Sequence, residues 1–232
     1  MLILKLKYFV HYYKSKILKK KCKKNYKDQK IKFEYDIKEK NFSNKWFLNN
    51  FDIFNFFLPK DKNSKFDYLE VGCFEGLSSF FVLSEYKAVN AILLDIWDMP
   101  NPNSKTLSHN FNSIEKAFDN NLSGFNFTKI KDDSVVAMRK LFKQNKSFDF
   151  IYIDGSHNGE DILSDAIEAF KILKKEGLIF FDDFLQYDKN RALQSYDGML
   201  LAGHCVRGMW KLLRRDAARG TRVRRAFTTS DS

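Results

Sequence analysis

The stretch DYLEVGCFEG at residues 67–76 and the stretch FDFIYIDGSH at residues 148–157 have the same form. Each contains a short apolar run, which is typical of a β-strand, followed by acidic residues and glycine. The first stretch continues into an apolar helical segment as far as Tyr86. A buried strand, a glycine-containing turn and a helix together form the repeating unit of a parallel α/β sheet. These two stretches therefore predict an α/β fold.

The rest of the chain extends this alternation. Strands are predicted at residues 67–71, 91–95, 125–130, 148–153 and 178–181, and helices follow the first four at residues up to 86, 108–122, 134–145 and 160–175. Several strands are apolar on successive residues, as expected where helices cover both faces of a sheet. The pattern predicts a Rossmann-like, doubly wound and mostly parallel sheet. An aromatic stripe at helical spacing predicts a further helix over residues 43–58 that packs on the domain as core.

The composition is that of a globular protein with one sizeable core. The chain has 232 residues, of which 44% are hydrophobic and 16% aromatic, unlike the composition of disordered chains. Its three cysteines, Cys22, Cys73 and Cys205, include no CxxC pair. Because three cysteines cannot all be paired within one chain, we expect a reducing, cytoplasmic compartment and no structural zinc site.

Positive charge is concentrated at the two ends of the chain, whose formal net charge is +11. Residues 1–27 contain ten Lys and no acidic residue. Residues 28–190 contain 21 basic and 26 acidic residues, and residues 191–232 contain nine basic and three acidic residues. A protein that lays its folded body on phosphates is usually basic across that body. The acidic body therefore argues against a nucleic-acid partner.

The basic N-terminal extension, residues 1–40, has the pattern of an amphipathic helix. Its apolar residues recur at steps of three and four, at Ile3, Leu6, Val10, Tyr13 and Ile17. Lysines interrupt the run, so it is too short and too charged to span a bilayer, and it lacks the features of a secretory signal. Two hypotheses stay open for residues 1–27: peripheral contact with an anionic membrane surface, or a solvated or partner-binding arm.

The composition changes abruptly near residue 190. Arginine replaces lysine as the main basic residue in residues 191–232, and asparagine, abundant earlier, is absent after Asn190. This Arg-rich tail has no clear strand pattern. We therefore expect the folded domain to cover residues 41–190. The sequence leaves open whether the C-terminal part of the sheet is complete, and it does not indicate an oligomeric state.

The first two predicted strands end in residues suited to a nucleoside, because ligands of parallel α/β sheets bind at the carboxyl ends of the strands. Gly72 and Gly76 would let the backbone pass close to a ligand and start a helix whose N-terminus faces it. Glu70 precedes this turn, whose G-x-x-x-G spacing differs from that of dinucleotide-binding proteins. Asp95 ends the second strand, where a carboxylate can accept hydrogen bonds from ribose hydroxyls. A helix cap or a loop acid is the alternative interpretation of Asp95.

The third predicted strand is followed by Asp132, Asp133 and Ser134. At this edge of the sheet they would lie near an adenine ring, so Asp133 and Ser134 are candidates for cofactor binding. Asp or Ser just before a helix is also the ordinary choice for an N-cap. Both interpretations stay open from the sequence.

The fourth and fifth predicted strands give the strongest chemical signal. Asp154 and His157 follow the fourth strand, and Asp182 and Asp183 follow the fifth. If these strands are neighbours, the three carboxylates converge, and each pair repels by several kcal/mol at an effective dielectric of about 20. A hard cation, Mg²⁺ or Mn²⁺, is the simplest compensation for all-oxygen ligands, although one acid could instead cap a helix and another could meet a Lys. His157 is placed to act as a general base.

With these motifs in view, residues 67–184 resemble the class I S-adenosylmethionine-dependent methyltransferases. Among them the chain is similar to the metal-dependent sugar O-methyltransferases that act on macrolide and aminocoumarin antibiotics. The turn at residues 70–76 resembles the first cofactor motif of that family, and Asp95 its ribose-binding acid. Residues 154–157 resemble its D-G-x-H motif, and residues 182–183 its D-D motif.

The resemblance implies an O-methyltransferase that uses S-adenosylmethionine and acts, with a metal ion, on a hydroxyl of a sugar or another small molecule. It implies that Asp154, Asp182 and Asp183 hold Mg²⁺ or Mn²⁺. It also implies a catalytic centre of Asp154 and His157, in which His157 deprotonates the acceptor. The family normally completes its sheet with a helix and an antiparallel pair of strands, which the tail does not obviously supply.

Two other functions stay open on the residues alone. A nucleotide-sugar-dependent transferase also places acids at strand ends, but it would need Lys or Arg around the phosphates, and the turn at residues 72–76 supplies none. A non-catalytic binding module could instead act through its basic termini.

Overall fold

The computed structural model describes residues 20–97, 111–156, 159–182 and 226–227. Its helices are α2 (Lys27–Asp36), α3 (Phe51–Phe57), α4 (Leu77–Glu85), α5 (Phe111–Asn121), α6 (Ser134–Lys143) and α7 (Gly159–Lys171), with short 3₁₀ helices η1 (Ile37–Glu39) and η2 (Trp46–Asn49). Its strands are β1 (Phe66–Val71), β2 (Val89–Asp95), β3 (Thr128–Lys131), β4 (Phe148–Ile153), β5 (Leu173–Phe181) and β6 (Ala226–Phe227). From β1 to β5 strands and helices alternate, as predicted.

The strands form one sheet in the order β3-β2-β1-β4-β5-β6. All five neighbouring pairs are parallel. The chain winds outward from β1 to β3 on one side and from β4 to β6 on the other, so the predicted doubly wound sheet is confirmed. The switch in strand order lies between β1 and β4, and in such sheets the ligand crevice opens at the carboxyl ends of the strands beside that switch.

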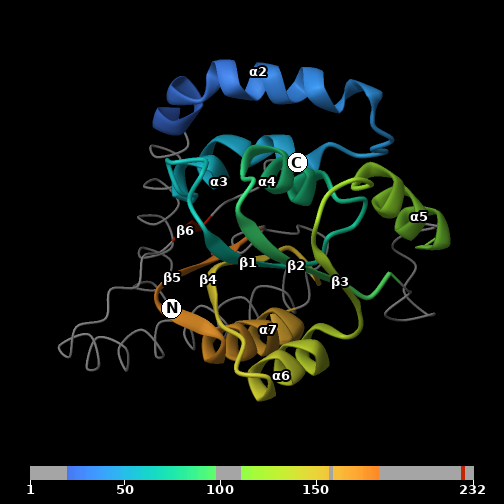
Figure 1. Cartoon of the computed structure of the whole chain (residues 1–232), viewed down its shortest axis with the longest axis vertical. Helices are drawn as coiled ribbons and strands as arrows, with labels where there is room; N and C mark the ends of the chain where they lie inside the picture. The colour runs from blue at the N-terminus through green and yellow to red at the C-terminus, as the bar shows by residue number, and fades with distance from the viewer. Residues whose placement is uncertain (1–19, 98–110, 157–158, 183–225, 228–232) are drawn as a thin grey trace, which may run out of the picture.

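Helices cover both faces of the sheet, which is why its strands are apolar on successive residues. Figure 1 shows α3 and α4 on one face, with α2 lying outside them, and α6 and α7 on the opposite face. The side chains on the α3–α4 face are mostly aromatic, and those on the α6–α7 face are mostly aliphatic. Phe54 of α3 lies near the centre of the aromatic face, with its ring centroid 4.8 Å from that of Tyr152, 5.4 Å from Phe150 and 5.5 Å from Phe180.

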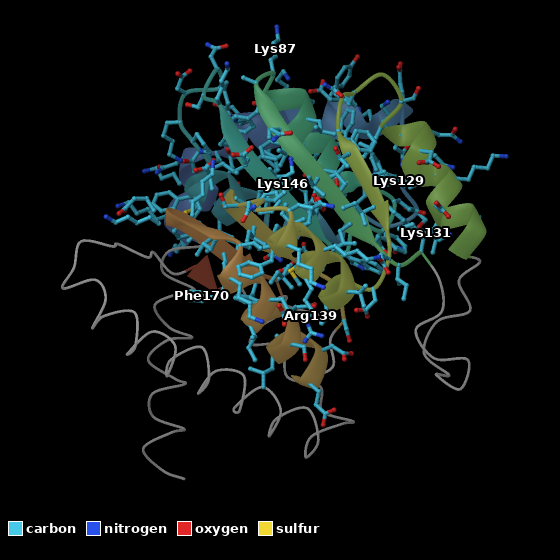
Figure 2. All side chains as sticks on the ribbon, turned by 60° about the horizontal axis from the view of Figure 1, so that its bottom comes forward. Lys87, Lys129, Lys131, Arg139, Lys146 and Phe170 are labelled. Atoms are coloured by element: carbon cyan, nitrogen blue, oxygen red, sulfur yellow. The ribbon has the colours of Figure 1, made fainter. Side chains whose placement is uncertain are left out.

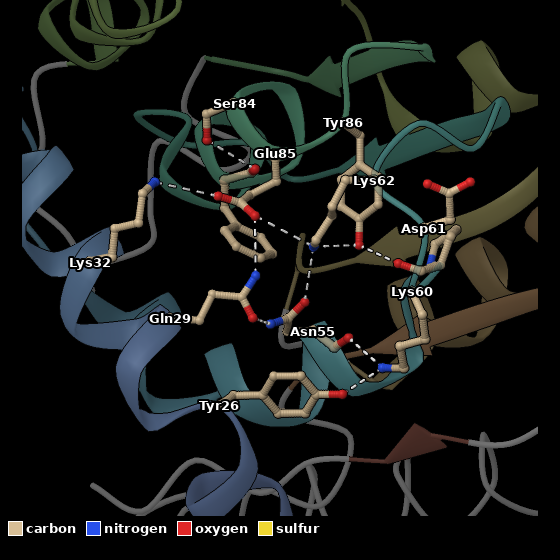
Figure 3. Close-up of polar contacts among 12 residues, drawn as sticks. Tyr26, Gln29, Lys32, Asn55, Lys60, Asp61, Lys62, Ser84, Glu85 and Tyr86 are labelled. Atoms are coloured by element: carbon tan, nitrogen blue, oxygen red, sulfur yellow. Dashed lines mark hydrogen bonds and ion pairs between the residues drawn. The ribbon is translucent and has the colours of Figure 1, made fainter.

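A polar network fixes α2 against the elements beneath it (Figure 3). Gln29 of α2 donates to Glu85 Oε2 at 3.1 Å and accepts from Asn55 Nδ2 at 2.6 Å. Lys62 Nζ donates to Tyr86 Oη at 2.8 Å and lies 3.6 Å from Glu85 Oε2. Burial lowers the pKa of Lys62, although Glu85 opposes that shift. The network therefore joins α2, α3 and α4 into one covering layer.

Ion pairs attach α5 to the outer strand β3. Lys129 Nζ lies 2.8 Å from Glu115 Oε1 and 2.7 Å from Asp119 Oδ1, and Lys131 Nζ lies 2.5 Å from Glu115 Oε2. Figure 2 labels both lysines on β3, beside α5. These pairs are largely on the surface, where each contributes at most about 1 kcal/mol.

The boundary between α7 and β5 differs from the prediction. The predicted helix over residues 160–175 ends at Lys171, and β5 starts at Leu173 rather than at residue 178. Lys174 is drawn to the sheet by Asp67 and by Asp149, whose Oδ2 lies 2.7 Å from its Nζ. The register between β4 and β5 shifts here: Phe148 pairs with Leu173, and Phe150 pairs with Leu178.

Three further predictions need adjustment. The helix predicted over residues 43–58 is interrupted at Asn50, which separates η2 from α3. The third strand is shorter than predicted and begins at Thr128. The tail, in which no clear strand pattern was found, contributes the two-residue strand β6, which is parallel to β5.

The rest of residues 191–232, and the predicted amphipathic stripe at residues 3–17, lie outside the described residues. In the described part of the chain, no helix has the length and apolar character needed to cross a membrane. Cys22 and Cys73 are free and buried.

Gly72 marks the closest approach between the ends of β1 and β4. Its φ is +86°. A Cβ atom added at Gly72 would lie 2.2 Å from the carbonyl oxygen of Asp154 and 2.6 Å from Cα of Gly155. These are backbone atoms that the sheet holds in place, so only glycine fits at this position.

We expect Gly72→Ala to lower the free energy of unfolding more than Gly124→Ala does. Gly124 has φ +89°, and nothing lies within 4 Å of an added Cβ. It therefore isolates the cost of positive φ, roughly 1–2 kcal/mol. Gly72→Ala adds overpacking of about 1–3 kcal/mol or more. Urea unfolding measures both variants, and equal losses would contradict the close approach.

Candidate active site

Backbone hydrogen bonds bring the acidic strand ends to one edge of the sheet. The amide N–H of Asp154 donates to Val71 O at 2.8 Å, that of Asp182 to Ile153 O at 2.9 Å and that of Asp132 to Asp95 O at 3.2 Å. Each bond extends a parallel ladder one residue beyond its strand. Each of these acids therefore lies directly after the end of its strand, at a position fixed by pairing with the neighbouring strand.

Asp154 and Asp182 meet at one hydroxyl. Tyr152 Oη lies 2.7 Å from Asp182 Oδ2 and 3.1 Å from Asp154 Oδ2. The fourth and fifth strands are neighbours, which is the condition for their acids to converge, because Ile153 pairs with Phe181. The tyrosine is fully buried, and burial, followed by the two aspartates, raises its pKa well above the usual value. The hydroxyl thus stays protonated, with one proton for two carboxylates.

Asp182 also accepts a hydrogen bond from Asn50, a residue far upstream in the sequence. Asn50 Nδ2 donates to Asp182 Oδ1 at 2.5 Å. Asn50 lies between η2 and α3 and is 2% exposed. Both oxygens of Asp182 are therefore within hydrogen-bonding distance of donors on two different layers of the fold.

The other two residues predicted at this centre, His157 and Asp183, lie outside the described residues. Within the part that the structure describes, no group of three or more His, Cys, Asp or Glu side chains is arranged to hold a metal ion. Of the predicted acidic triple, the structure therefore brings together the two members that it describes, Asp154 and Asp182.

Asp95 is held by two strained loops. Its Oδ2 accepts from the backbone N–H of Phe74 at 2.8 Å and its Oδ1 from that of Trp97 at 2.9 Å. Phe74 has φ +49° and Trp97 φ +39°, a region that residues other than glycine rarely adopt and that is concentrated at ligand sites. Burial raises the pKa of Asp95, against the effect of these amides. The carboxylate is therefore fixed in orientation at the end of β2.

Glu70 lies beneath the glycine turn and is fully buried. Its Oε2 accepts from Tyr68 Oη at 2.8 Å and from Ser79 Oγ at 2.8 Å, and its Oε1 accepts from Ser78 Oγ. Burial raises its pKa to about 7, although the three hydroxyls oppose that shift. The carboxylate is thus bonded to the chain's own hydroxyls, and direct contact with a cofactor stays a prediction.

Gly76 starts the helix that follows the turn. It is the N-cap of α4 with φ +84°, and an added Cβ would lie 3.0 Å from Phe118 and 3.1 Å from Leu122. As predicted, the two glycines bring the backbone from β1 into a helix whose N-terminus lies at the carboxyl edge of the sheet.

Asp133 and Ser134 have structural roles at the start of α6. Asp133 is the N-cap, and its side chain accepts from the N–H of Val136 at 3.0 Å. Ser134 Oγ donates to Asp165 Oδ1 at 2.5 Å. The capping interpretation of Asp133 is therefore present in the structure, and contact with an adenine ring stays a prediction for both residues.

Three site residues were not predicted: Tyr152, Asn50 and Asp165. Tyr152 carried a signal, because it precedes Asp154 by two positions in a strand and so faces the same side. Asp165 is 2% exposed on the apolar stripe of α7, where burial raises its pKa to about 6. An acidic residue on the apolar face of a predicted helix can also be recognised from the sequence. Asn50 carried no local signal, because only the tertiary fold brings it to Asp182.

Comparison with known proteins agrees with this geometry. A family model described as a methyltransferase domain matches residues 69–184, half of the chain. The match begins inside β1 and extends just past the end of β5, and thus covers every strand end discussed above. No curated protein sequence matches the chain.

Solved structures share the fold at low sequence identity. A putative caffeoyl-CoA O-methyltransferase from Staphylococcus aureus is 15% identical with a TM-score of 0.53, over 82% of this chain and 88% of that one. Precorrin-8w decarboxylase from Methanobacterium thermoautotrophicum is 18% identical with a TM-score of 0.36, over 50% and 52%. CalO1, a methyltransferase of calicheamicin biosynthesis in its SAH-bound form, is 18% identical with a TM-score of 0.36, over 60% and 37%.

The chain thus spans about half the length of the decarboxylase and little more than a third of CalO1. At these identities the first of the three matches shows a common fold, and the weaker two add nothing to it. The family match, the strand order and the glycine turn beside the switch point agree with one another. The chain belongs to the methyltransferase domain family, the class I S-adenosylmethionine-dependent methyltransferases.

Proposed function

We propose that this protein transfers the methyl group of S-adenosylmethionine to a hydroxyl of a sugar or another small molecule, with the help of a divalent metal ion. The observation that carries the proposal is the meeting of Asp154 and Asp182 at one hydroxyl. This meeting takes place at the switch point of a methyltransferase fold, one strand away from the turn at Gly72.

The cofactor region of the proposal extends from β1 to β3. Gly72 and Gly76 form the turn after β1, where protein atoms occupy the space that side chains would fill. The amides of Phe74 and Trp97 hold Asp95, which would accept hydrogen bonds from ribose hydroxyls. Glu70 supports the turn from below through Ser78, Ser79 and Tyr68. Asp133 and Ser134, at the end of β3, stay candidates for the adenine side.

The metal region lies on the other side of the switch. Asp154, Asp182 and the adjacent Asp183 are the proposed ligands, and all-oxygen ligands suit Mg²⁺ or Mn²⁺. The fit rests on the position and chemistry of the donors. Asp154 and Asp182 lie at the carboxyl ends of neighbouring strands, and both carboxylates are within hydrogen-bonding distance of the Tyr152 hydroxyl.

The residues of the chain would divide the reaction between them. Methyl transfer from a sulfonium is an in-line displacement, so the acceptor oxygen must be aligned with the S–CH₃ bond. Bound beside the acceptor, a divalent cation lowers the pKa of a coordinated hydroxyl. His157 would take the proton of that hydroxyl as general base. The proposed acceptor site thus lies between the two halves of the sheet edge.

Residues 41–50 supply a wall for the proposed acceptor. The N–H of Ser43 donates to Glu75 Oε2 at 2.6 Å, and Asn50 donates to Asp182. Between them, Trp46 is 59% exposed and its ring lies 5.6 Å from that of Phe74. An exposed indole beside a reactive edge can pack against the flat face of a ring, which supports a sugar or another cyclic acceptor.

Calorimetry with S-adenosylhomocysteine tests the proposed cofactor site. We expect Asp95→Asn to weaken binding roughly 10- to 100-fold, because a hydrogen bond to a charged group contributes about 1.5–3 kcal/mol. Asp133→Asn, which keeps an equally good N-cap, should weaken it less. Binding of UDP-sugars but not of S-adenosylhomocysteine would instead favour a nucleotide-sugar transferase, and binding of neither would favour a binding module.

Titration with Mn²⁺ tests the proposed metal site. We expect the full chain to bind Mn²⁺ and Asp154→Asn to weaken binding at least about 100-fold, because even residues behind the ligands cost 10- to 100-fold. Asp149→Asn is the matched control, since Asp149 lies in the same strand at the opposite edge and pairs with Lys174. If the two variants bind Mn²⁺ equally well, the metal site is wrong.

Glu70 gives the stability a pH dependence. The pKa of Glu70 is raised in the folded state to about 7. Protonated Glu70 therefore stabilises the fold fully at a pH below its pKa in the unfolded chain, and this stabilisation is lost as the pH rises through about 7. We expect the difference in unfolding free energy between wild type and Glu70→Gln to change between pH 5 and pH 8 by on the order of 3 kcal/mol. Urea unfolding across this range measures it. A constant difference would show that Glu70 has an ordinary pKa.

A further inference from the structure

The hydroxyl of Tyr152 lies within hydrogen-bonding distance of two acids of the proposed metal site, Asp154 and Asp182. Tyr152 lies in β4 with 0% exposure, and its ring packs 4.8 Å from Phe54 and 5.7 Å from Phe180. This packing leaves the ring little freedom to turn. The hydroxyl is therefore held at a fixed point between the two carboxylates.

A second tyrosine in the same sheet shows what is special about Tyr152. Tyr68 of β1 is also 0% exposed and also donates to an acid two residues later, Glu70, at 2.8 Å. Glu70, however, receives two further hydroxyl donors from α4, the helix that follows β1. Tyr152 instead links acids from two different strands. The pairing of Glu70 with Tyr152 in the sheet register places the two arrangements side by side.

Asn50 restricts the same carboxylate from the other side. It donates to Asp182 Oδ1 at 2.5 Å, while Tyr152 lies 2.7 Å from Oδ2. One donor on each oxygen fixes the plane of the carboxylate. Asn50 belongs to the covering layer and Tyr152 to the sheet, so the orientation of Asp182 depends on how that layer is docked.

We propose that Tyr152, with Asn50, is a positioning residue that holds Asp154 and Asp182 at the separation a divalent cation requires. The inference rests on the proposed metal-assisted function. Partners that orient metal ligands through hydrogen bonds typically change metal affinity 10- to 100-fold when they are removed. Tyr152 acts through the two carboxylates and need not touch the substrate.

The test is Mn²⁺ binding to the full chain, measured by calorimetry for wild type, Tyr152→Phe and Tyr68→Phe. Tyr152→Phe keeps the buried ring and removes only the hydroxyl, so we expect the dissociation constant to rise at least about tenfold. Tyr68→Phe removes an equally buried hydroxyl from the neighbouring strand and should leave Mn²⁺ affinity unchanged. Thermal unfolding and S-adenosylhomocysteine binding of Tyr152→Phe should stay near wild type, which a general loss of structure would not allow.

Asn50→Leu is a second variant, which tests the same inference if Tyr152→Phe does not fold. It removes the donor to Asp182 Oδ1 while keeping a side chain of the same branched shape, and it should also weaken Mn²⁺ binding. Wild-type Mn²⁺ affinity in Tyr152→Phe, or an equal loss in Tyr68→Phe, would overturn the inference while leaving the metal site intact. A wild type that binds no Mn²⁺ would overturn the proposed metal-assisted function, and this role with it.

Discussion

The contact between the backbone of Gly72 and the carbonyl of Asp154 is the constraint on which the site depends. It places the turn after β1 directly against the end of β4, with no room for a side chain. The pairing of β1 with β2 then fixes the position of Asp95, and the pairing of β4 with β5 fixes that of Asp182. The strand ends that carry Asp95, Asp154 and Asp182 are thus brought to one edge by strand register. The precision of the site is a property of the sheet.

The two faces of the sheet explain how polar groups come to lie at its edge. On the α3–α4 face, aromatic rings fill the core, and two of them, Tyr68 and Tyr152, carry hydroxyls toward the carboxyl end. Each reaches an acid two residues farther along its strand. On the aliphatic face under α6 and α7, the described buried residues include no tyrosine. The aromatic core therefore both stabilises the fold and orients the acids of the site.

The fold was predictable because its signals are local and repeated. Apolar runs such as residues 148–153, each ending in acids or glycine, alternate with helices and so predict parallel strands whose ends share one edge. The order of the strands was not predicted. The α7–β5 boundary could not be predicted, because Lys174 leaves the helical pattern only through its distant partners Asp67 and Asp149. At the site the convergence of Asp154 and Asp182 was readable, whereas Asn50 reaches Asp182 across 132 positions of sequence.

The most direct test of this account is a crystal structure of the full chain grown with S-adenosylhomocysteine and Mn²⁺, with the metal located by its anomalous scattering. We expect one Mn²⁺ peak in contact with carboxylate oxygens of both Asp154 and Asp182, and a nucleoside whose ribose hydroxyls are bound by Asp95. A metal peak elsewhere, Asp154 and Asp182 turned apart, or a nucleoside bound away from the turn at Gly72 would contradict it.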